Sequence, residues 1–262
     1  MNDAKVSSID STRPTSQAIA FARLNATRLG AERKRATFEG VGAGFYLYLF
    51  NFDGVLADTL QHYQHAVHVA ARTSGAKIVD VPVSVLTNAE SLDANGIADA
   101  LNLPEDIRAR FACHLETNLN NGLWRCSCFE GVRQLLTTLS SRGYVAVMSR
   151  SHSGMIETIL QNHGLRSAVH RIIGSEQTGT PDEKLEMLLN QYNVQAKNAI
   201  YCGDSVRDIN FAHRHGLRSA ACTWGWQPQL VVNCDATFTA NRTGQLLAQL
   251  LAPAGLEPDV AI

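Results

Sequence analysis

The sequence predicts an α/β protein with a doubly wound parallel sheet and an inserted helical segment. The first observation is an alternation of helical and strand patterns from Gly131 onward, which is typical of a parallel sheet with helices on both faces. The second is that polar residues directly follow several apolar runs. The third is a stretch between about residues 59 and 127 with helical periodicity and no strand of convincing length.

The first predicted strand is the apolar run Phe45–Phe50, which ends abruptly at Asn51 and Asp53. An apolar run followed by Asp-Gly predicts a buried strand that delivers polar side chains to a tight loop. Apolar residues then recur at helical spacing in the segments 60–70, 97–101 and 107–115. We expect this part of the chain to be a small helical insertion.

The remaining elements alternate along the chain. Helices are predicted over residues 132–139, 156–163, 184–192 and 209–215, and strands over residues 144–148, 169–173, 199–202 and 218–222. Open parallel sheets bind ligands beyond the carboxyl ends of their strands. Asn51, Asp53, Ser149 and Asp204 all sit at such ends, so we expect them to converge on one site.

Four motifs in order carry a resemblance to a known family. The first motif is YLYLFNFDGVLADT at 46–59, and the last is GDSVRD at 203–208. Between them lie Ser149, which follows the apolar run VAVM, and then Lys184. This pattern resembles the haloacid dehalogenase-like (HAD) phosphohydrolases, and the resemblance extends from Phe45 to Trp226. It implies a fold with a Rossmann-like core.

The resemblance also implies a domain organisation. The stretch TWGW at 223–226 and the position of the insertion are similar to the phosphoglycolate-phosphatase-like branch, which has a C1 cap between the first two motifs. The expected parts are a basic polar leader at 1–43, a core at 44–57 and 129–250, a helical cap at 58–128 and a tail at 251–262. A cap in this place would close over the site, exclude water and select the substrate.

Asp53 has two interpretations. In the family resemblance it is the general acid/base, which protonates the leaving oxygen and then activates water. The alternative is a turn aspartate that caps backbone amides beside Gly54. The later motifs favour the catalytic interpretation.

The resemblance further implies a phosphate-binding set made of Phe52, Asp53, Ser149, Arg150 and Lys184. The hydroxyl of Ser149 and the backbone N–H groups after it would hold a phosphoryl oxygen. The family's Lys-Pro-x-Pro form is missing, because Thr180 stands where that form would place its lysine. Lys184 suits the family's other arrangement, and the alternative is a solvent-facing lysine on a helix.

A metal site is implied by the same resemblance. Mg²⁺ prefers oxygen ligands, and the expected ones are the backbone carbonyl of Asp53 and the carboxylates of Asp204 and Asp208. Asp204 is expected as a direct ligand, and Asp208 as a direct or water-mediated one. The alternative is a helix N-cap, with Asp204 or Ser205 capping and Asp208 favouring the first-turn dipole.

Asn51 departs from the family pattern. The family has an aspartate nucleophile at this position, and a carboxamide is a poor nucleophile that would not form the acyl-phosphate. The amide also removes one negative charge from the expected Mg²⁺ site. Three explanations are open: a natural replacement, an engineered substrate trap, or conversion to aspartate by deamidation, which the bulky Phe52 should slow.

Two functions follow as hypotheses. The first is an HAD-family, Mg²⁺-dependent hydrolase of a small phosphorylated metabolite, which is impaired because the nucleophile position is Asn51. The alternative is a non-catalytic phosphoester-binding pseudophosphatase with a regulatory or partner-binding role. The identity of residue 51 discriminates between them, because an aspartate at this position in close relatives would indicate an enzymatic family.

Composition bounds the partners. With a net charge of −1, the chain has no overall electrostatic field that would attract nucleic acid or a membrane surface. No apolar stretch reaches the length of a membrane span. The six scattered cysteines and the lack of a secretory signal are typical of a cytoplasmic protein with reduced thiols. Residues 17–35 form a candidate protein-binding helix, with a solvated leader or a docked helix as the alternative.

Overall fold

The computed structural model describes residues 47–78, 80–123 and 126–252. The predicted leader at 1–43, including the candidate helix at 17–35, lies outside the described residues, as do residues 253–262 of the predicted tail. Within the described part of the chain, no helix combines the length and the apolar character that a bilayer span requires.

A six-stranded parallel sheet forms the centre of the core, with the strand order β5-β4-β1-β6-β7-β8. The strands are β1 (Leu47–Phe50), β4 (Tyr144–Met148), β5 (Arg171–Ile173), β6 (Ala199–Gly203), β7 (Arg218–Cys222) and β8 (Phe238–Ala240). All residues of the three central strands β4, β1 and β6 are buried, as expected for a parallel sheet covered on both faces. The predicted fold class is confirmed.

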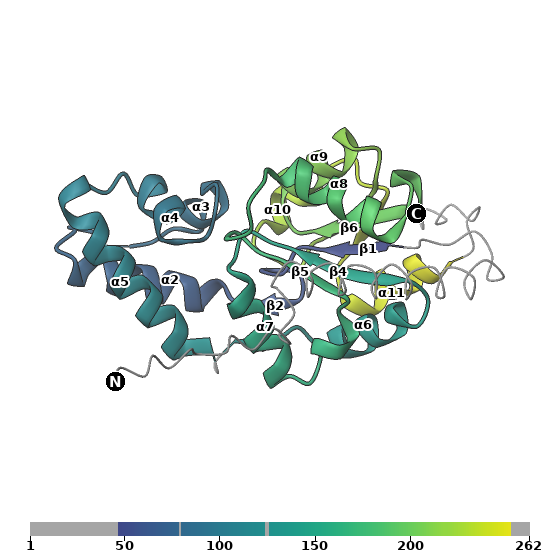
Figure 1. Cartoon of the computed structure of the whole chain (residues 1–262), viewed down its shortest axis with the longest axis horizontal. Helices are drawn as coiled ribbons and strands as arrows, with labels where there is room; N and C mark the ends of the chain where they lie inside the picture. Colours follow the sequence, from purple (N-terminus) through teal and green to yellow (C-terminus); the bar gives the residue numbers. More distant parts are fainter. Residues whose placement is uncertain (1–46, 79, 124–125, 253–262) are drawn as a thin grey trace, which may run out of the picture. The chain divides into compact units, whose positions relative to one another are not determined.

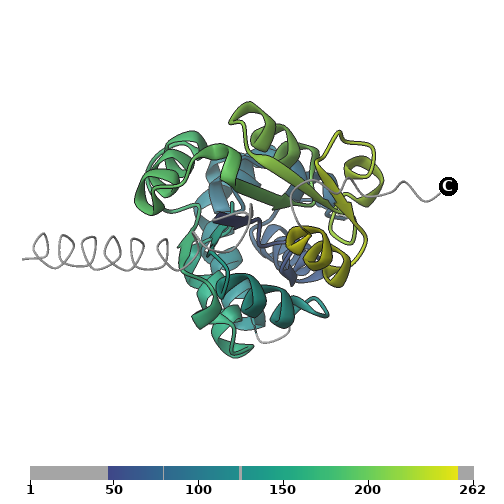
Figure 2. The same ribbon diagram turned by 90° about the vertical axis from the view of Figure 1, so that its right-hand side faces the viewer.

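Helices cover both faces of this sheet (Figures 1 and 2). One face carries α6 (Val132–Ser140), α7 (Ser153–Asn162) and α11 (Thr243–Leu251), and the other carries α8 (Pro181–Tyr192), α9 (Val206–Arg214) and α10 (Pro228–Val231). Chain order explains this division for the helices that connect strands, because the strand order reverses direction after β5 and right-handed crossovers then run over the opposite face. The helix α11 follows the last strand and is not a crossover.

Four helices lie in the chain between β1 and β4. They are α2 (Leu60–Thr73), α3 (Val83–Asn88), α4 (Ala94–Ala100) and α5 (Glu105–Gly122), and α2 packs against α5 (Figure 1). A short antiparallel pair, β2 (Ala57–Asp58) and β3 (Ser127–Cys128), joins the start and the end of this segment. The helical insertion therefore leaves and re-enters the core at adjacent points, while the exact domain limits stay a prediction.

Most predicted elements match the structure within a few residues, and the differences have local causes. The helix α8 begins at Pro181, three residues before Lys184, because Thr180 and Glu183 form a capping box around its first turn. The strand β5 begins at Arg171 and not at residue 169, because a 3-10 turn at Arg166–Ala168 delays it. The elements β2, α3, β3, α10, β8 and α11 were not predicted.

The register of the central strands sets the edge at which the polar residues emerge. Phe50, the last residue of β1, lies opposite Val147 of β4 and Cys202 of β6. The residues that follow these strands therefore start from one edge of the sheet. This places Asn51, Ser149 and Asp204 at the same edge, as the sequence predicts.

Candidate active site

Asn51 stands directly after β1, and its backbone N–H donates to the carbonyl of Cys202 at 2.9 Å, which extends the pairing with β6 by one residue. Its side chain is fully engaged. The Oδ1 atom accepts from the backbone N–H of Phe52 at 2.8 Å. The Nδ2 atom donates to the carbonyl oxygen of Asp53 at 3.1 Å and to Oδ1 of Asp204 at 3.1 Å.

The Asp53 carboxylate is buried and is held by three hydroxyl groups. Thr59 donates to its Oδ1 atom at 2.8 Å. Ser149 and Ser151 donate to its Oδ2 atom at 3.1 Å and 2.6 Å. Burial raises the pKa of Asp53, and the three hydroxyl groups oppose that shift. Within the described residues its carboxylate bonds to side chains of other segments, and not to the backbone amides of its own turn.

Two of these hydroxyls were missed by the sequence analysis. Ser151 lies two residues after Ser149, and Thr59 lies just before α2. Tyr63, in the first turn of α2, shares a 2.7 Å hydrogen bond with Ser151. A cluster of hydroxyl residues after a strand was the available signal, but the sequence could not indicate that α2 approaches this loop.

Asp204 follows β6 and is also enclosed. Besides the bond from Asn51, its Oδ2 atom accepts from the backbone N–H of Trp226 at 2.6 Å. The pKa of Asp204 is raised to about 7, mainly by burial and then by the neighbouring charge of Asp208, while hydrogen bonds from Trp226 and Asn51 oppose the rise. The backbone donor at Trp226 was not predicted, because nothing in the sequence shows that the loop after β7 reaches the end of β6.

Close backbone approach requires glycine beside this carboxylate. A Cβ atom on Gly54, whose φ is +79°, would lie 2.1 Å from Oδ2 of Asp204, and a Cβ atom on Gly225 would lie 2.3 Å from the same oxygen. The indole Nε1 of Trp224 donates to the carbonyl of Val55 at 3.1 Å and so joins these two loops. The TWGW segment thus packs directly onto the loop that follows β1.

Asp208 adopts the capping arrangement that the sequence analysis left as an alternative. Its carboxylate accepts from the Ser205 backbone N–H at 3.2 Å and from the Ser205 hydroxyl at 2.7 Å, in a capping box that begins α9. Burial raises its pKa, and the hydrogen bonds from Ser205 and the charge of Arg150 oppose that rise. We call Asn51, Asp53, Asp204 and Asp208 the acidic cradle.

The arrangement of the acidic cradle does not fit the Mg²⁺ ion that the family resemblance implies. The two oxygen atoms expected as ligands, the Asp53 carbonyl and Asp204 Oδ1, both point at the Asn51 amide nitrogen, which is a hydrogen-bond donor. Asp208 is directed to Ser205. Among the described residues no group of three or more His, Cys, Asp or Glu side chains is arranged to hold a metal ion.

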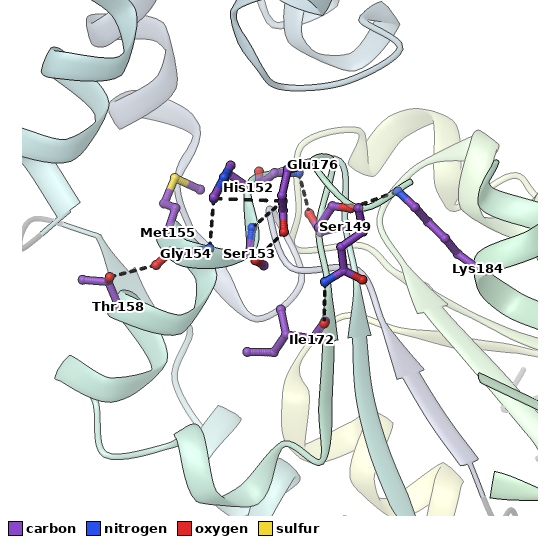
Figure 3. Close-up of polar contacts among 12 residues, drawn as sticks. Ser149, His152, Ser153, Gly154, Met155, Thr158, Ile172, Glu176 and Lys184 are labelled. Carbon is purple, nitrogen blue, oxygen red and sulfur yellow. Dashed lines mark hydrogen bonds and ion pairs between the residues drawn. The ribbon is translucent and has the colours of Figure 1, made fainter. Parts of the chain in front are cut away.

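Ser149 and Lys184 lie beside the loop that follows β5 (Figure 3). Ser149 donates from its backbone to Ile173 at 3.0 Å, and its hydroxyl bonds to Asp53. Lys184 donates its ammonium group to the carbonyl of Gly174 at 3.0 Å. Burial lowers the pKa of Lys184, and the nearby Glu176 opposes this shift. Thr180 is the N-cap of α8. The role of Lys184 as the phosphate-binding cation stays a prediction.

Arg150 and Phe52 have partners that the sequence did not indicate. The Arg150 guanidinium donates to the carbonyls of Leu86 and Ala89, at the end of α3, at 3.0 Å and 2.5 Å. The backbone N–H of Phe52 donates to the side-chain oxygen of Asn51. A role of either residue in phosphate binding stays a prediction.

Comparison with known proteins identifies a family. Residues 48–222 match the family model described as haloacid dehalogenase-like hydrolase. The phosphoglycolate phosphatase of Synechococcus elongatus is 28% identical over 193 residues, which cover 71% of this chain and 88% of that protein. The phosphoglycolate phosphatase of Vibrio cholerae is 28% identical over 222 residues, which cover 79% of this chain and 98% of that protein.

Solved structures share the fold. The crystal structure of a predicted phosphoglycolate phosphatase from Haemophilus somnus superposes with a TM-score of 0.71 at 17% identity, and the match covers 78% of this chain and 97% of that one. The match to the family model spans the strands β1 to β7, including every residue of the acidic cradle. The chain therefore belongs to the family of haloacid dehalogenase-like hydrolases.

Proposed function

We propose that this chain binds a small phosphorylated metabolite at the acidic cradle, as an HAD-family phosphatase would, and that its hydrolysis of the phosphoester is impaired at residue 51. The relatives named phosphoglycolate phosphatases support this class of ligand. The observation that carries the proposal is the state of the Asn51 carboxamide, whose oxygen and nitrogen are both engaged in hydrogen bonds.

Chemistry explains why Asn51 impairs hydrolysis. A carboxylate attacks phosphorus through a negatively charged oxygen, whereas a carboxamide is neutral and its oxygen is a much weaker nucleophile. In this chain that oxygen also accepts the Phe52 N–H. Asp53 does not replace it, because its reach and position are those of the proton donor.

The other groups retain roles that suit phosphoester binding. We assign Asp53 as the general acid/base, since burial raises its pKa and favours the protonated form that can donate to a leaving oxygen. We assign Ser149, Lys184 and the guanidinium of Arg150 to the phosphate, as a hydroxyl donor and two cations near the same sheet edge. Trp226 adds a buried indole N–H that has no partner among the described residues.

Phosphate release from 2-phosphoglycolate and a panel of other small phosphoesters tests this proposal. The unmodified chain and its Asn51→Asp variant are compared in the presence of Mg²⁺, and mass spectrometry verifies that residue 51 has not deamidated. We expect turnover only from the variant, because it regains the carboxylate nucleophile. The double variant with Asp53→Asn is the matched control, and it should lose the regained turnover.

Two outcomes contradict the proposal. Turnover by the unmodified chain with Asn51 verified would show that residue 51 does not limit hydrolysis. If neither protein turns over, binding of 2-phosphoglycolate to the unmodified chain is measured by calorimetry, with Ser149→Ala and Lys184→Met for comparison. Binding that weakens in both variants supports the proposed site, and an absence of binding to the unmodified chain contradicts it.

A further inference from the structure

We propose that the Asn51 carboxamide replaces the divalent cation that an acid at this position would need, so that the acidic cradle of this chain forms without a bound metal. The central observation is that the Asp53 carbonyl oxygen and Asp204 Oδ1 both lie 3.1 Å from one atom, the amide nitrogen of Asn51. Two oxygens that would ligate a metal are therefore satisfied by two N–H bonds from the chain itself.

The surroundings determine the orientation of the amide. One end of the Asn51 side chain faces a donor, the backbone N–H of Phe52, and the other end faces two acceptors. Only the observed orientation pairs a donor with an acceptor at every contact. Rotation of the amide would lose all three hydrogen bonds and would set its oxygen against the Asp204 carboxylate.

Further oxygens of the cradle also accept hydrogen bonds from the protein. The second oxygen of Asp204 accepts the Trp226 backbone N–H at 2.6 Å, and Asp208 accepts from Ser205. The loops leave little space around them, because a Cβ atom on Gly203 would lie 2.5 Å from Oδ2 of Asp208. Both oxygens of the buried Asp204 and one oxygen of the half-buried Asp208 thus have donors from the protein where a metal would otherwise compensate them.

An aspartate at residue 51 would behave differently. One of its oxygens could still accept the Phe52 N–H, but the other would face the Asp53 carbonyl and the Asp204 carboxylate. Two buried carboxylates in contact disfavour each other, and a cation between them removes the repulsion. The Asn51→Asp variant should therefore require a divalent cation that the unmodified chain does not require.

Thermal unfolding and isothermal titration calorimetry with Mg²⁺ test this inference. For the unmodified chain we expect the same midpoint of unfolding in EDTA and in millimolar Mg²⁺, and no saturable heat of binding. For Asn51→Asp we expect a lower midpoint of unfolding in EDTA than for the unmodified chain, and recovery of the midpoint on adding Mg²⁺. We also expect saturable Mg²⁺ binding, at least about tenfold tighter than any binding by the unmodified chain, because the affinity of oxygen sites follows ligand charge. Asn241→Asp, the same change at an exposed residue, should leave the Mg²⁺ response unchanged.

Each other outcome overturns the inference. Saturable Mg²⁺ binding to the unmodified chain, or a loss of stability in EDTA, would show that the amide does not replace the cation. If neither protein binds Mg²⁺, residue 51 is not the determinant. If Asn51→Asp fails to fold in EDTA, refolding in Mg²⁺ supports the inference and failure in both conditions contradicts it. These readouts do not involve phosphate release, so their failure is distinguishable from failure of the proposed function.

Discussion

At the scale of single residues, the hydroxyl cluster around Asp53 shows how the chain tolerates a buried carboxylate. Burying an acid costs free energy unless donors compensate it. Thr59, Ser149 and Ser151 supply three donors, and the Tyr63 hydroxyl is bonded to Ser151 in turn. The cluster compensates the buried carboxylate and restricts its rotation.

The change Ser151→Ala should destabilise the protein by about 1–3 kcal/mol, because it removes the shortest bond to Asp53 and leaves the buried Tyr63 hydroxyl without this partner. Urea unfolding measures the difference. Ser141→Ala is the matched control, since this exposed serine bonds only within its own helix end, and its effect should stay within about 0.5 kcal/mol. Equal effects of the two changes would contradict the role given to Ser151.

At the scale of secondary-structure elements, two arginines connect the helical insertion to the core. Arg150, after β4, and Arg207, in α9, both donate to the carbonyl of Ala89, at 2.5 Å and 3.2 Å. Ala89 is the C-cap of α3, where cations are favourable because the helix dipole leaves carbonyls exposed. The backbone N–H of Leu92 returns a bond to the carbonyl of Arg150 at 3.0 Å.

The change Arg150→Met should loosen the segment from Leu86 to Leu92, since the methionine keeps an apolar stem but loses both charge-assisted bonds. We expect the opening free energy of this segment to fall by about 1–3 kcal/mol. Amide hydrogen exchange read by mass spectrometry measures it. The matched control is Arg133→Met. The Arg133 guanidinium bonds to the carbonyls of His163 and Gly164 and not to the segment from Leu86 to Leu92, so exchange of that segment should not change. Unchanged exchange in Arg150→Met would contradict the connection.

At the scale of the whole molecule, the buried acids make stability depend on pH. Burial raises the pKa of Asp204 from 3.8 to about 7, and it also raises the pKa values of Asp53 and Asp208. A carboxyl group with a raised pKa binds more protons in the folded state than in the unfolded state between the two values. Its contribution to stability is therefore present at low pH and is lost as pH rises through that window.

For the unmodified chain we expect the free energy of unfolding to decrease as pH rises from about 4 to about 7, relative to the Asp204→Asn variant, which cannot titrate at this position. Urea unfolding at several pH values gives the two slopes. The slopes are compared rather than the absolute stabilities, because the new NH₂ group at residue 204 would face either the Asn51 donor or the Trp226 donor. Equal slopes would show that Asp204 does not titrate in this range.

The sequence by itself determined the alternation of elements, the parallel sheet and the edge where Asn51, Ser149 and Asp204 emerge. These features follow from local periodicity and from the rule that polar residues after buried strands share one edge. The same local information missed β8, because this strand is only three residues long and its pairing with β7 is visible only in the fold.

Only the tertiary structure decided which donors meet which acceptors. That Asn51 bonds to Asp204, 153 residues later, and that Trp226 closes the other side of the same carboxylate, depends on loops that meet only when the sheet is assembled. The sequence left Asp208 compatible with a metal ligand or with a helix cap. Only the fold shows that it bonds to Ser205 in the capping box of α9, and its role as a metal ligand stays a prediction. Hydrogen bonds act over about 3 Å, so their partners are set by packing and not by spacing along the chain.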